Sequence, residues 1–496
     1  MGKRPCEAWL EPLLPGAKRF KHALRWILPH VSQGSALTEP SEGVYNCGRD
    51  NVEHDYICRV GHRIGSPEAS AAYEILGLLG RGTFGQVLRC RSSAGGQLAA
   101  LKVIKHEAYC DGLAAQADEE VAVLQRLSAA ARCRDDHIVR MLDAFTHCGH
   151  VCIAFEMLGP DLLAVLEKDG NPGMPLAFIR AVAQQLLAAL QCLRRASVIH
   201  GDLKPENVLL VPDRAPLGGL APRDPQVKLI DFGSAQVGCR VAENEDIIIQ
   251  TLPYRAPEVL LGLSYTCAVD MWSFGCICAE LVLGRPLFPH GGSEHDIVHN
   301  TLELLGPIPE HMLQAGRNTT RYFHRTSHKA TSSTAPPRKS TWFEHLWACC
   351  RRRKAMPTAD QLLRGMLRSV LRVQRRDPSP ASARQDFSLK TYRSKLDELG
   401  GARITSLEHA ISLLRYEISW TRAMPRRLRP EVLQTQRASR LQLLRFLLRC
   451  LQTNPDERWA PSEASAHAFV KGPAPSCREQ TPRRRWSFGG TPFVCR

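Results

Sequence analysis

Three side chains that could act together in phosphoryl transfer lie within residues 198–210: the carboxylate of Asp202, the ammonium of Lys204 and the amide of Asn207. Moving a phosphoryl group to a hydroxyl needs a carboxylate for the hydroxyl, a cation for the phosphate and a ligand for a metal ion. Apolar residues on both sides indicate a loop anchored in a core. A pattern this short also arises by chance, so the prediction depends on matching groups elsewhere in the chain.

A second carboxylate suited to metal binding follows further along the chain. Asp231 comes directly after an apolar segment, residues 227–230, and is followed by Phe232 and Gly233. The apolar segment predicts a buried strand, and the glycine gives the turn after it freedom to move. We therefore predict that Asp231 is a second metal-binding group of the chain.

Residues 73–87 predict two strands joined by a glycine-containing turn. Apolar residues alternate from Tyr73 onward, and Gly80, Gly82 and Gly85 follow. Because glycine has no Cβ atom, backbone amides at such positions can approach phosphate oxygens closely. By itself this spacing is typical of an ordinary hairpin, and only its context favours a phosphate site.

That context is a lysine inside an apolar strand. Residues 98–104 predict a strand in which Lys102 is surrounded by apolar neighbours, and a lysine there needs an anion. Residues 114–132 show the spacing of a helix with Val121, Leu124 and Leu127 on its inner face. Glu120 lies on this helix and is the predicted partner of Lys102.

The elements divide the chain into two parts of different character, which predicts an α+β fold with two lobes. Residues 73–157 form a small strand-rich lobe with one main helix. Residues 158–470 form a large, mainly helical lobe, with helices predicted at residues 162–167, 175–196, 267–283, 294–305 and 439–451.

Residues 73–470 resemble the eukaryotic protein kinases of the proline-directed group. Besides the groups above, the resemblance rests on residues 155–158, 200–202, 231–235, 254–262 and 313–323. Within the group the likeness is nearest to homeodomain-interacting protein kinases, with dual-specificity tyrosine-regulated kinases as close cousins. The resemblance implies the bilobal protein-kinase fold and a reaction in which ATP, with Mg²⁺, phosphorylates Ser or Thr, with Tyr as a further acceptor, in protein substrates with proline next.

The resemblance also implies a role for each matching residue. The nucleotide is covered by Leu79, Gly80, Gly82, Gly85 and Val87, its phosphates meet Lys102 held by Glu120, its adenine meets the backbone of Glu156 and Leu158, and its ribose meets Asp161. In the catalytic loop, Asp202 accepts the hydroxyl proton, Lys204 offsets phosphate charge, and Asn207 with Asp231 binds magnesium. Three more residues are structural: Asp270 clamps the catalytic loop, and Glu258 pairs with Arg458.

Two positions depart from the commoner pattern. Gly201 stands where many kinases carry an arginine that holds a phosphorylated activation segment, and Ile248 stands where the close family has an activating tyrosine. Our hypothesis is that this chain does not need tyrosine autophosphorylation. Thr251 and Tyr254 remain as hydroxyls on the segment, and Arg255 is expected to shape a pocket for the proline that follows the acceptor.

The net charge of +16 is regional. Residues 311–450 carry 29 basic and 9 acidic side chains, while the rest of the chain is slightly acidic. This segment holds the variable insertion, about residues 325–438, with a basic run at 351–354 and a helical pattern at 358–372. A nuclear-import patch or a surface for polyanions is one interpretation, and a solvated loop or a helix docked on the lobe is the other.

The flanks and the cysteines bear on location. Residues 1–72 predict a partly disordered basic head and residues 471–496 a basic disordered tail. The 18 cysteines lack zinc-type spacing, and no uninterrupted apolar run reaches the length needed to cross a membrane. We expect an intracellular protein, in the nucleus first and the cytoplasm second.

Two functions compete with a kinase. One is a scaffold that keeps the fold without chemistry, which the presence of Lys102, Asp202, Asn207 and Asp231 disfavours. The other is a nucleic-acid or chromatin adaptor that works through residues 311–450, and it predicts polyanion binding with a steep salt dependence.

Overall fold

The computed structural model describes residues 32–66, 69–106, 112–129, 137–168, 173–212, 225–238, 249–288, 291–325, 387–389 and 429–472. It comprises two units, one of Met1–Thr319 with Tyr392–Arg496 and the other of Thr320–Thr391. In the second unit β11 (Phe323–Arg325) and β12 (Phe387–Leu389) pair as a short antiparallel two-stranded sheet. The basic run at 351–354, the helix predicted at 358–372, the tail and Ile248 lie outside the described residues.

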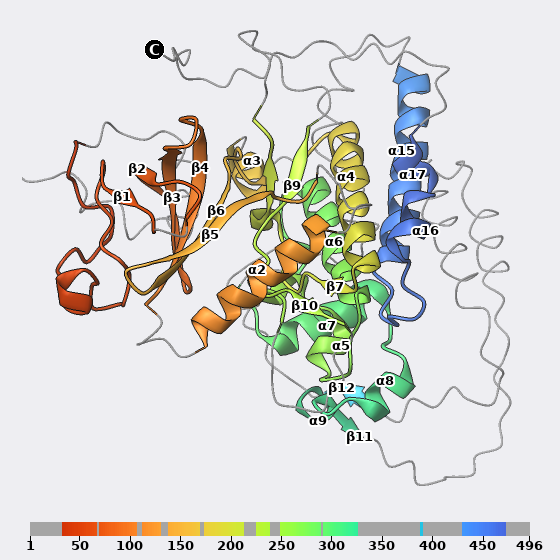
Figure 1. Cartoon of the computed structure of the whole chain (residues 1–496). Helices are drawn as coiled ribbons and strands as arrows, with labels where there is room; N and C mark the ends of the chain where they lie inside the picture. The colour runs from red at the N-terminus through yellow and green to blue at the C-terminus, as the bar shows by residue number, and fades with distance from the viewer. Residues whose placement is uncertain are drawn as a thin grey trace, which may run out of the picture. The chain divides into compact units, whose positions relative to one another are not determined.

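The small lobe of the first unit is built on one antiparallel sheet with the strand order β1-β2-β3-β4-β6-β5 (Figure 1). Its strands are β1 (Arg63–Ile64), β2 (Tyr73–Gly82), β3 (Gly85–Ser92), β4 (Leu98–Ile104), β5 (Met141–His147) and β6 (His150–Glu156). The predicted alternation is confirmed in β2, where Tyr73 and Ile75 are buried and Glu74 is not. The same alternation places Leu101 and Val103 in the core under β4.

The main helix of this lobe is α2 (Leu113–Ala129). It buries Glu120, Leu124 and Leu127 as predicted, but Val123 takes the inner position expected for Val121. The spacing 120, 123, 124 and 127 is one helical stripe, and Val121 lies beside it. The carboxylate of Glu120 therefore faces inward with the apolar residues.

Within the head that the sequence predicts to be partly disordered, residues 32–66 have a defined structure. Cys58 and Ile64 are fully buried in the same core cluster as β2 and β3, and β1 pairs with β2. Four polar side chains of this stretch are also buried, namely Thr38, Asp50, Asn51 and Asp55. These polar side chains bond to the sheet and to one another. The polar composition of the stretch therefore does not mean that it is solvated.

The large lobe is helical and centres on α6 (Ala268–Leu283), which is buried along nearly its whole length. It packs against α4 (Leu176–Arg195) and α15 (Arg429–Cys450), visible together in Figure 1. The other helices of the lobe are α3 (Leu162–Lys168), α5 (Pro257–Leu260), α7 (Glu294–Leu305), α8 (Glu310–Ala315), α16 (Pro461–Ser465) and α17 (Ala468–Lys471), while α9 (Thr319–Tyr322) begins the second unit. Phe446 of α15 connects α6 and α17 through ring contacts to Phe274 and Phe469.

The helix predicted at residues 175–196 is present, and one face of it is buried through Ile179, Val182, Leu186, Leu190 and Leu193. Among the described residues α4 is the one helix whose length and hydropathy match a membrane span, and two-thirds of it is buried inside the lobe. Such burial is typical of a core helix.

Short strands and turns carry the loops of the large lobe. The strands are β7 (Val198–Ile199), β8 (Val208–Leu210), β9 (Val227–Leu229) and β10 (Gln236–Val237), and they pair as β7 with β10 and β8 with β9. One-turn 3₁₀ helices lie at Pro205–Asn207 and Leu252–Tyr254. Residues 200–204 therefore form a loop on the connection from β7 to β8, as the sequence predicts, and each of these strands is paired with a different partner.

Candidate active site

The loop that follows β7 is held from inside the large lobe by Asp270. Its two carboxylate oxygens accept the backbone N–H groups of His200, at 2.8 Å, and Gly201, at 3.1 Å. Burial raises the pKa of Asp270, while these two hydrogen bonds act to lower it. The predicted clamp residue is thus in contact with the loop that it was expected to fix.

His200 fixes the same loop through its ring. Its Nε2 lies 3.0 Å from the carbonyl oxygen of Ile230, and its Nδ1 lies 3.2 Å from the backbone N–H of Asp202. Because a carbonyl can only accept and an N–H can only donate, the ring must carry its proton on Nε2. A neutral imidazole therefore links the loop to the segment before Asp231.

Asp202 is surrounded by donors from two segments. Lys204 Nζ lies 2.6 Å from its Oδ2, and Thr251 donates both its hydroxyl, at 2.7 Å, and its backbone N–H, at 3.1 Å, to Oδ1. The side-chain N–H of Asn207 donates to the backbone carbonyl of Asp202 at 2.8 Å. The three predicted groups of the loop are therefore brought together, and Thr251 joins them.

Lys102 brings the small lobe to the same place. Its Nζ lies 2.8 Å from Glu120 Oε2 and 3.0 Å from Asp231 Oδ1. Burial acts to lower the pKa of Lys102, but the two carboxylates outweigh it and raise the pKa. Burial raises the pKa of Glu120. Burial also acts to raise the pKa of Asp231, but the attraction of Lys102 outweighs it and lowers that pKa. The ammonium is therefore charged at neutral pH, and it lies between the carboxyl groups of Glu120 and Asp231.

The turn after β9 is fixed in an unusual backbone conformation. Asp231 has φ +62°, in the left-handed region that few non-glycine residues adopt. The side-chain N–H of Gln116, on α2, donates to the carbonyl oxygen of Gly233. Helix α2 therefore holds both Lys102, through Glu120, and the turn that carries Asp231.

The glycine hairpin lies next to Lys102 across the sheet. In the strand register Gly80 pairs with Val87, and Val87 pairs with Lys102. Cross-strand partners present their side chains on the same face, so Val87 and Lys102 share one face of the sheet. Leu79 falls at a register shift in β2 and Gly82 at the turn. The five residues predicted to cover a nucleotide are thus adjacent to the predicted phosphate-binding lysine.

One glycine of the hairpin is required by close packing. Gly85 has φ +144°, and a Cβ there would collide with the carbonyl oxygen of Val103 on β4. Any other residue would push β3 away from β4, so glycine fixes the distance between the hairpin and the strand of Lys102.

The predicted adenine and ribose contacts lie where β6 leads into the large lobe. Glu156 ends β6, and its carboxylate bonds to Lys228 at 2.6 Å and to the backbone N–H of Arg140 at 2.7 Å. Leu158 is buried. Asp161 directly precedes α3, and its carboxylate accepts the N–H of Ala164 at 2.7 Å. The side chains of Glu156 and Asp161 have structural partners here, and their nucleotide contacts stay a prediction.

The two hydroxyls expected on the activation segment are both engaged. Thr251 is bonded to Asp202, and Tyr254 is 1% exposed and donates its hydroxyl to Glu280 at 2.6 Å. Burial raises the pKa of Tyr254, and Glu280 adds to the rise. The neighbour of Ile248, Ile249, is buried. Within the described residues neither hydroxyl is presented for modification.

The predicted pair of Glu258 and Arg458 is present and buried. The two guanidinium nitrogens lie 2.6 and 2.9 Å from the two carboxylate oxygens, and Arg458 also lies over the ring of Trp272. A bidentate pair of this kind is strong and geometrically specific. It joins the segment after α15 to the segment before α6.

Sequence reasoning missed Thr251 and Gln116 as partners of the site. Thr251 lies 49 residues after Asp202, and Gln116 lies 117 residues before Gly233. Neither residue type is unusual in its own segment, so only the folded structure reveals the contacts.

The fold and the site define a bilobal enzyme of the phosphoryl-transfer type. Residues 73–470 match the model of the protein kinase domain. The chain therefore belongs to the protein kinase family, and the predicted family and fold are confirmed.

Curated relatives agree with this assignment. The chain is 35% identical to the serine/threonine-protein kinase ppk15 of Schizosaccharomyces pombe over 88% of this chain and 68% of that protein. It is 35% identical to a dual specificity protein kinase YAK1 homolog of Arabidopsis thaliana over 90% of this chain, but only 41% of that protein. It is 40% identical to homeodomain-interacting protein kinase 2 of Mus musculus over 58% of this chain and 22% of that protein. The chain thus spans less than half of the last two relatives.

Proposed function

We propose that this chain transfers the γ-phosphate of ATP to Ser and Thr hydroxyls of protein substrates. The observation that carries the proposal is the joining of two clusters, Lys102 with Glu120 and Asp231, and Asp202 with Lys204 and Asn207. A charged lysine held by two anions is placed for phosphates, and the neighbouring carboxylate for a hydroxyl. Little covalent chemistry is asked of the protein, which acts by positioning and electrostatics.

The residues present suit a magnesium ion. The amide nitrogen of Asn207 bonds to the carbonyl of Asp202, which orients that amide in the loop, and its oxygen with the Asp231 carboxylate gives hard oxygen donors. Among the described residues no group of three or more His, Cys, Asp or Glu could hold a metal alone, which fits a site completed by nucleotide phosphates. Bound there, Mg²⁺ would neutralise charge on the phosphates.

Each charged residue then has a task that its position supports. Lys102 holds the nucleotide phosphates, Asp202 orients the acceptor hydroxyl and receives its proton, and Lys204 offsets charge on the transferred group. Thr251 keeps Asp202 Oδ1 in place, which leaves Oδ2, beside Lys204, as the oxygen directed to the reaction. Dual specificity, with Tyr as an acceptor, is a property of the YAK1 relatives by name, and we extend it to this chain as part of the proposal.

A preference for proline after the acceptor is supported by Arg255. Its Nε and Nη2 donate to the carbonyl oxygen of Gln250 at 3.2 and 3.0 Å, and Gln250 has φ +66°. With that carbonyl engaged by Arg255, a substrate N–H placed beside it would lose an acceptor. Proline has no N–H to satisfy, so it is tolerated best.

The test uses the full chain with Mg·ATP and paired Ser peptides that differ by Pro or Ala after the acceptor. We expect transfer to the Pro peptide to be faster by tenfold or more, roughly the effect of one unpaired donor. Asp202→Asn and Lys102→Met should both abolish transfer. Equal low signals from wild type and Asp202→Asn would favour a scaffold without chemistry.

We propose a nuclear location, and polyanion binding through residues 311–450, on the charge of that segment alone. Removing residues 325–438 should abolish nuclear accumulation of the fluorescently tagged chain. It should also remove the salt-dependent part of its binding to heparin. Unchanged location and binding would contradict both proposals.

A further inference from the structure

The glycine hairpin has a second face, which carries Arg81 and Gln86. The two are cross-strand partners, next to the pair Gly80 and Val87. Successive residues of a strand point to opposite faces, so Arg81 and Gln86 point away from Val87 and Lys102. The side chain of Arg81, which lies between Gly80 and Gly82, is therefore on the face of the hairpin opposite the candidate nucleotide site.

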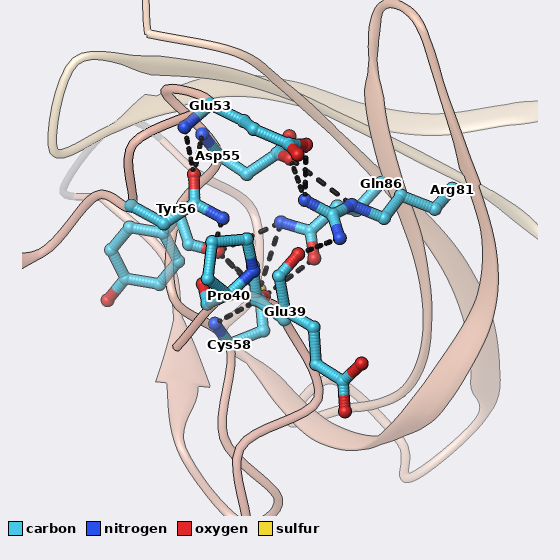
Figure 2. Close-up of polar contacts among 10 residues, drawn as sticks. Glu39, Pro40, Glu53, Asp55, Tyr56, Cys58, Arg81 and Gln86 are labelled. Carbon is cyan, nitrogen blue, oxygen red and sulfur yellow. Dashed lines mark hydrogen bonds and ion pairs between the residues drawn. The ribbon is translucent and has the colours of Figure 1, made fainter. Parts of the chain in front are cut away.

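On that side Arg81 meets a buried carboxylate. Its Nη2 and Nε lie 2.6 and 3.2 Å from Asp55 Oδ2, and Nη2 lies 2.9 Å from Glu53 Oε2. It also donates to the backbone carbonyl of Glu39. Figure 2 shows the guanidinium enclosed by these groups. The side chain of Asp55 is 1% exposed while that of Glu53 is 53% exposed, so Asp55 is the stronger partner.

Gln86 makes a second attachment on the same face. Its amide nitrogen donates to the carbonyl of Tyr56 at 2.9 Å (Figure 2). Its oxygen accepts the hydroxyl of Thr38 at 2.6 Å. Gln86 and Thr38 are both fully buried. Residues 38–58, which we call the strap, thus bind both strands of the hairpin close to its turn, through Arg81 on β2 and Gln86 on β3.

The strap is itself fixed. The side-chain oxygen of Asn51 accepts the N–H groups of Glu53 and Asp55 at 2.9 and 3.0 Å. Asp50 lies 3.0 Å from His150 Nε2, and both side chains are fully buried. The Nδ1 of His150 lies 2.7 Å from the carbonyl of Ile104, at the end of β4. The hairpin is therefore tied to a platform that is anchored in the rest of the sheet.

We propose that the strap is a positioning element for the nucleotide, acting through the ion pair of Asp55 with Arg81. Three glycines make the hairpin loose, and a loose segment loses entropy when it closes on a ligand. Because the strap already fixes the hairpin on the face of Arg81 and Gln86 before ATP binds, part of that entropy cost is removed, and KM for ATP is lower. The strap precedes the residues that match the family model, and the proposal rests on the function proposed above.

The test compares Asp55→Asn, Arg81→Gln and the double variant with Arg91→Gln in the full chain. Arg91 is the matched control because it forms an exposed ion pair with Glu74, at 3.6 Å, on the same two strands. We expect KM for ATP to rise about tenfold in each single variant, a mid-range coupling for residues in contact. KM for the peptide should stay as in wild type, Arg91→Gln should leave both unchanged, and the double variant should match the singles. Arg81→Lys should recover part of the loss.

Thermal unfolding of each variant and calorimetry with Mg·ATP separate the possible failures. If folded variants bind ATP as Arg91→Gln does, or if the single effects add in the double variant, the strap does not act through this pair. If Asp55→Asn does not fold, Glu53→Gln, which removes the exposed partner alone, should raise KM about twofold, and an unchanged KM overturns the proposal. If wild type binds no ATP, the proposed function fails and the strap proposal with it.

Discussion

At the scale of single residues, Gly201 is explained by the backbone of the catalytic loop. It has φ +76°, and a Cβ there would lie 2.7 Å from the carbonyl oxygen of Ser234. Its N–H is bonded to Asp270 and its carbonyl to the N–H of Gln250. The position therefore holds the loop, the turn after Asp231 and the activation segment close together. An arginine in this conformation would be strained as well as obstructed.

We predict that Gly201→Ala destabilises the chain by about 2–4 kcal/mol, the sum of the left-handed strain and the contact with Ser234. Gly238→Ala is the control, since Gly238 has φ +90° and an open space around its Cβ position. It should cost only the strain, about 1–2 kcal/mol. Urea unfolding of the two variants measures the difference, and equal costs would show that Ser234 gives way.

The chemical residues were identified from sequence because their types are rare in their surroundings. Lys102 stands out among apolar neighbours, and Asp202, Lys204 and Asn207 form a dense group. The structure brings Lys102, Glu120 and Asp231 within hydrogen-bond distance, as the resemblance implies. Their catalytic roles stay predictions. Thr251 was noticed only as a hydroxyl, because no local pattern reports a contact with a loop 49 residues away.

At the scale of elements, the period of burial along a strand or helix was predictable, while the contact partners were not. The alternation in β2 and the stripe on α4 follow from burial on one face. The strap has no such period, because its buried groups are polar and bind backbone atoms. Thr38, Asp55 and Asn51 read as solvated residues in the sequence, and only their contacts show that they are structural.

Cys58 gives a chemical readout of strap docking. It is fully buried, and burial raises its pKa to about 12 although Thr38 acts to lower it. The reactive thiolate is then about 10⁻⁴ of the total at pH 8. We predict that iodoacetamide modifies the exposed Cys47 at least about 100-fold faster than Cys58 in the native chain, measured by peptide mass mapping.

Labelling of the variant Asp55→Asn tests whether the ion pair with Arg81 keeps the strap packed on the sheet. Loosening the strap exposes Cys58 and lets its pKa fall, so its labelling should accelerate while that of Cys47 stays constant. Modification in urea confirms that the Cys58 peptide is detectable. Equal rates for the two cysteines in the native chain would mean that residues 38–58 do not stay docked.

At the scale of the whole molecule, the family match and the folded small lobe have different boundaries. The match begins at residue 73, which is also where the sequence pattern changes to alternating strands. The structure adds residues 32–66 to the small lobe through Cys58, Ile64 and β1. Polar composition concealed this, because a short buried strand such as β1 contributes one inward residue and no recognisable period.

We predict that a chain beginning at residue 73 is much less stable than one beginning at residue 32, which keeps every described contact of the strap. The shorter chain loses the burial of Ile64 and Cys58 against β2 and the polar attachments of Arg81 and Gln86. Burial of an isoleucine alone contributes about 1.5–3 kcal/mol. With the other contacts, the loss should lower Tm by at least about 6 °C at roughly 2–4 °C per kcal/mol. Differential scanning fluorimetry of both chains checks this, and equal melting temperatures would show that the lobe ends at β2.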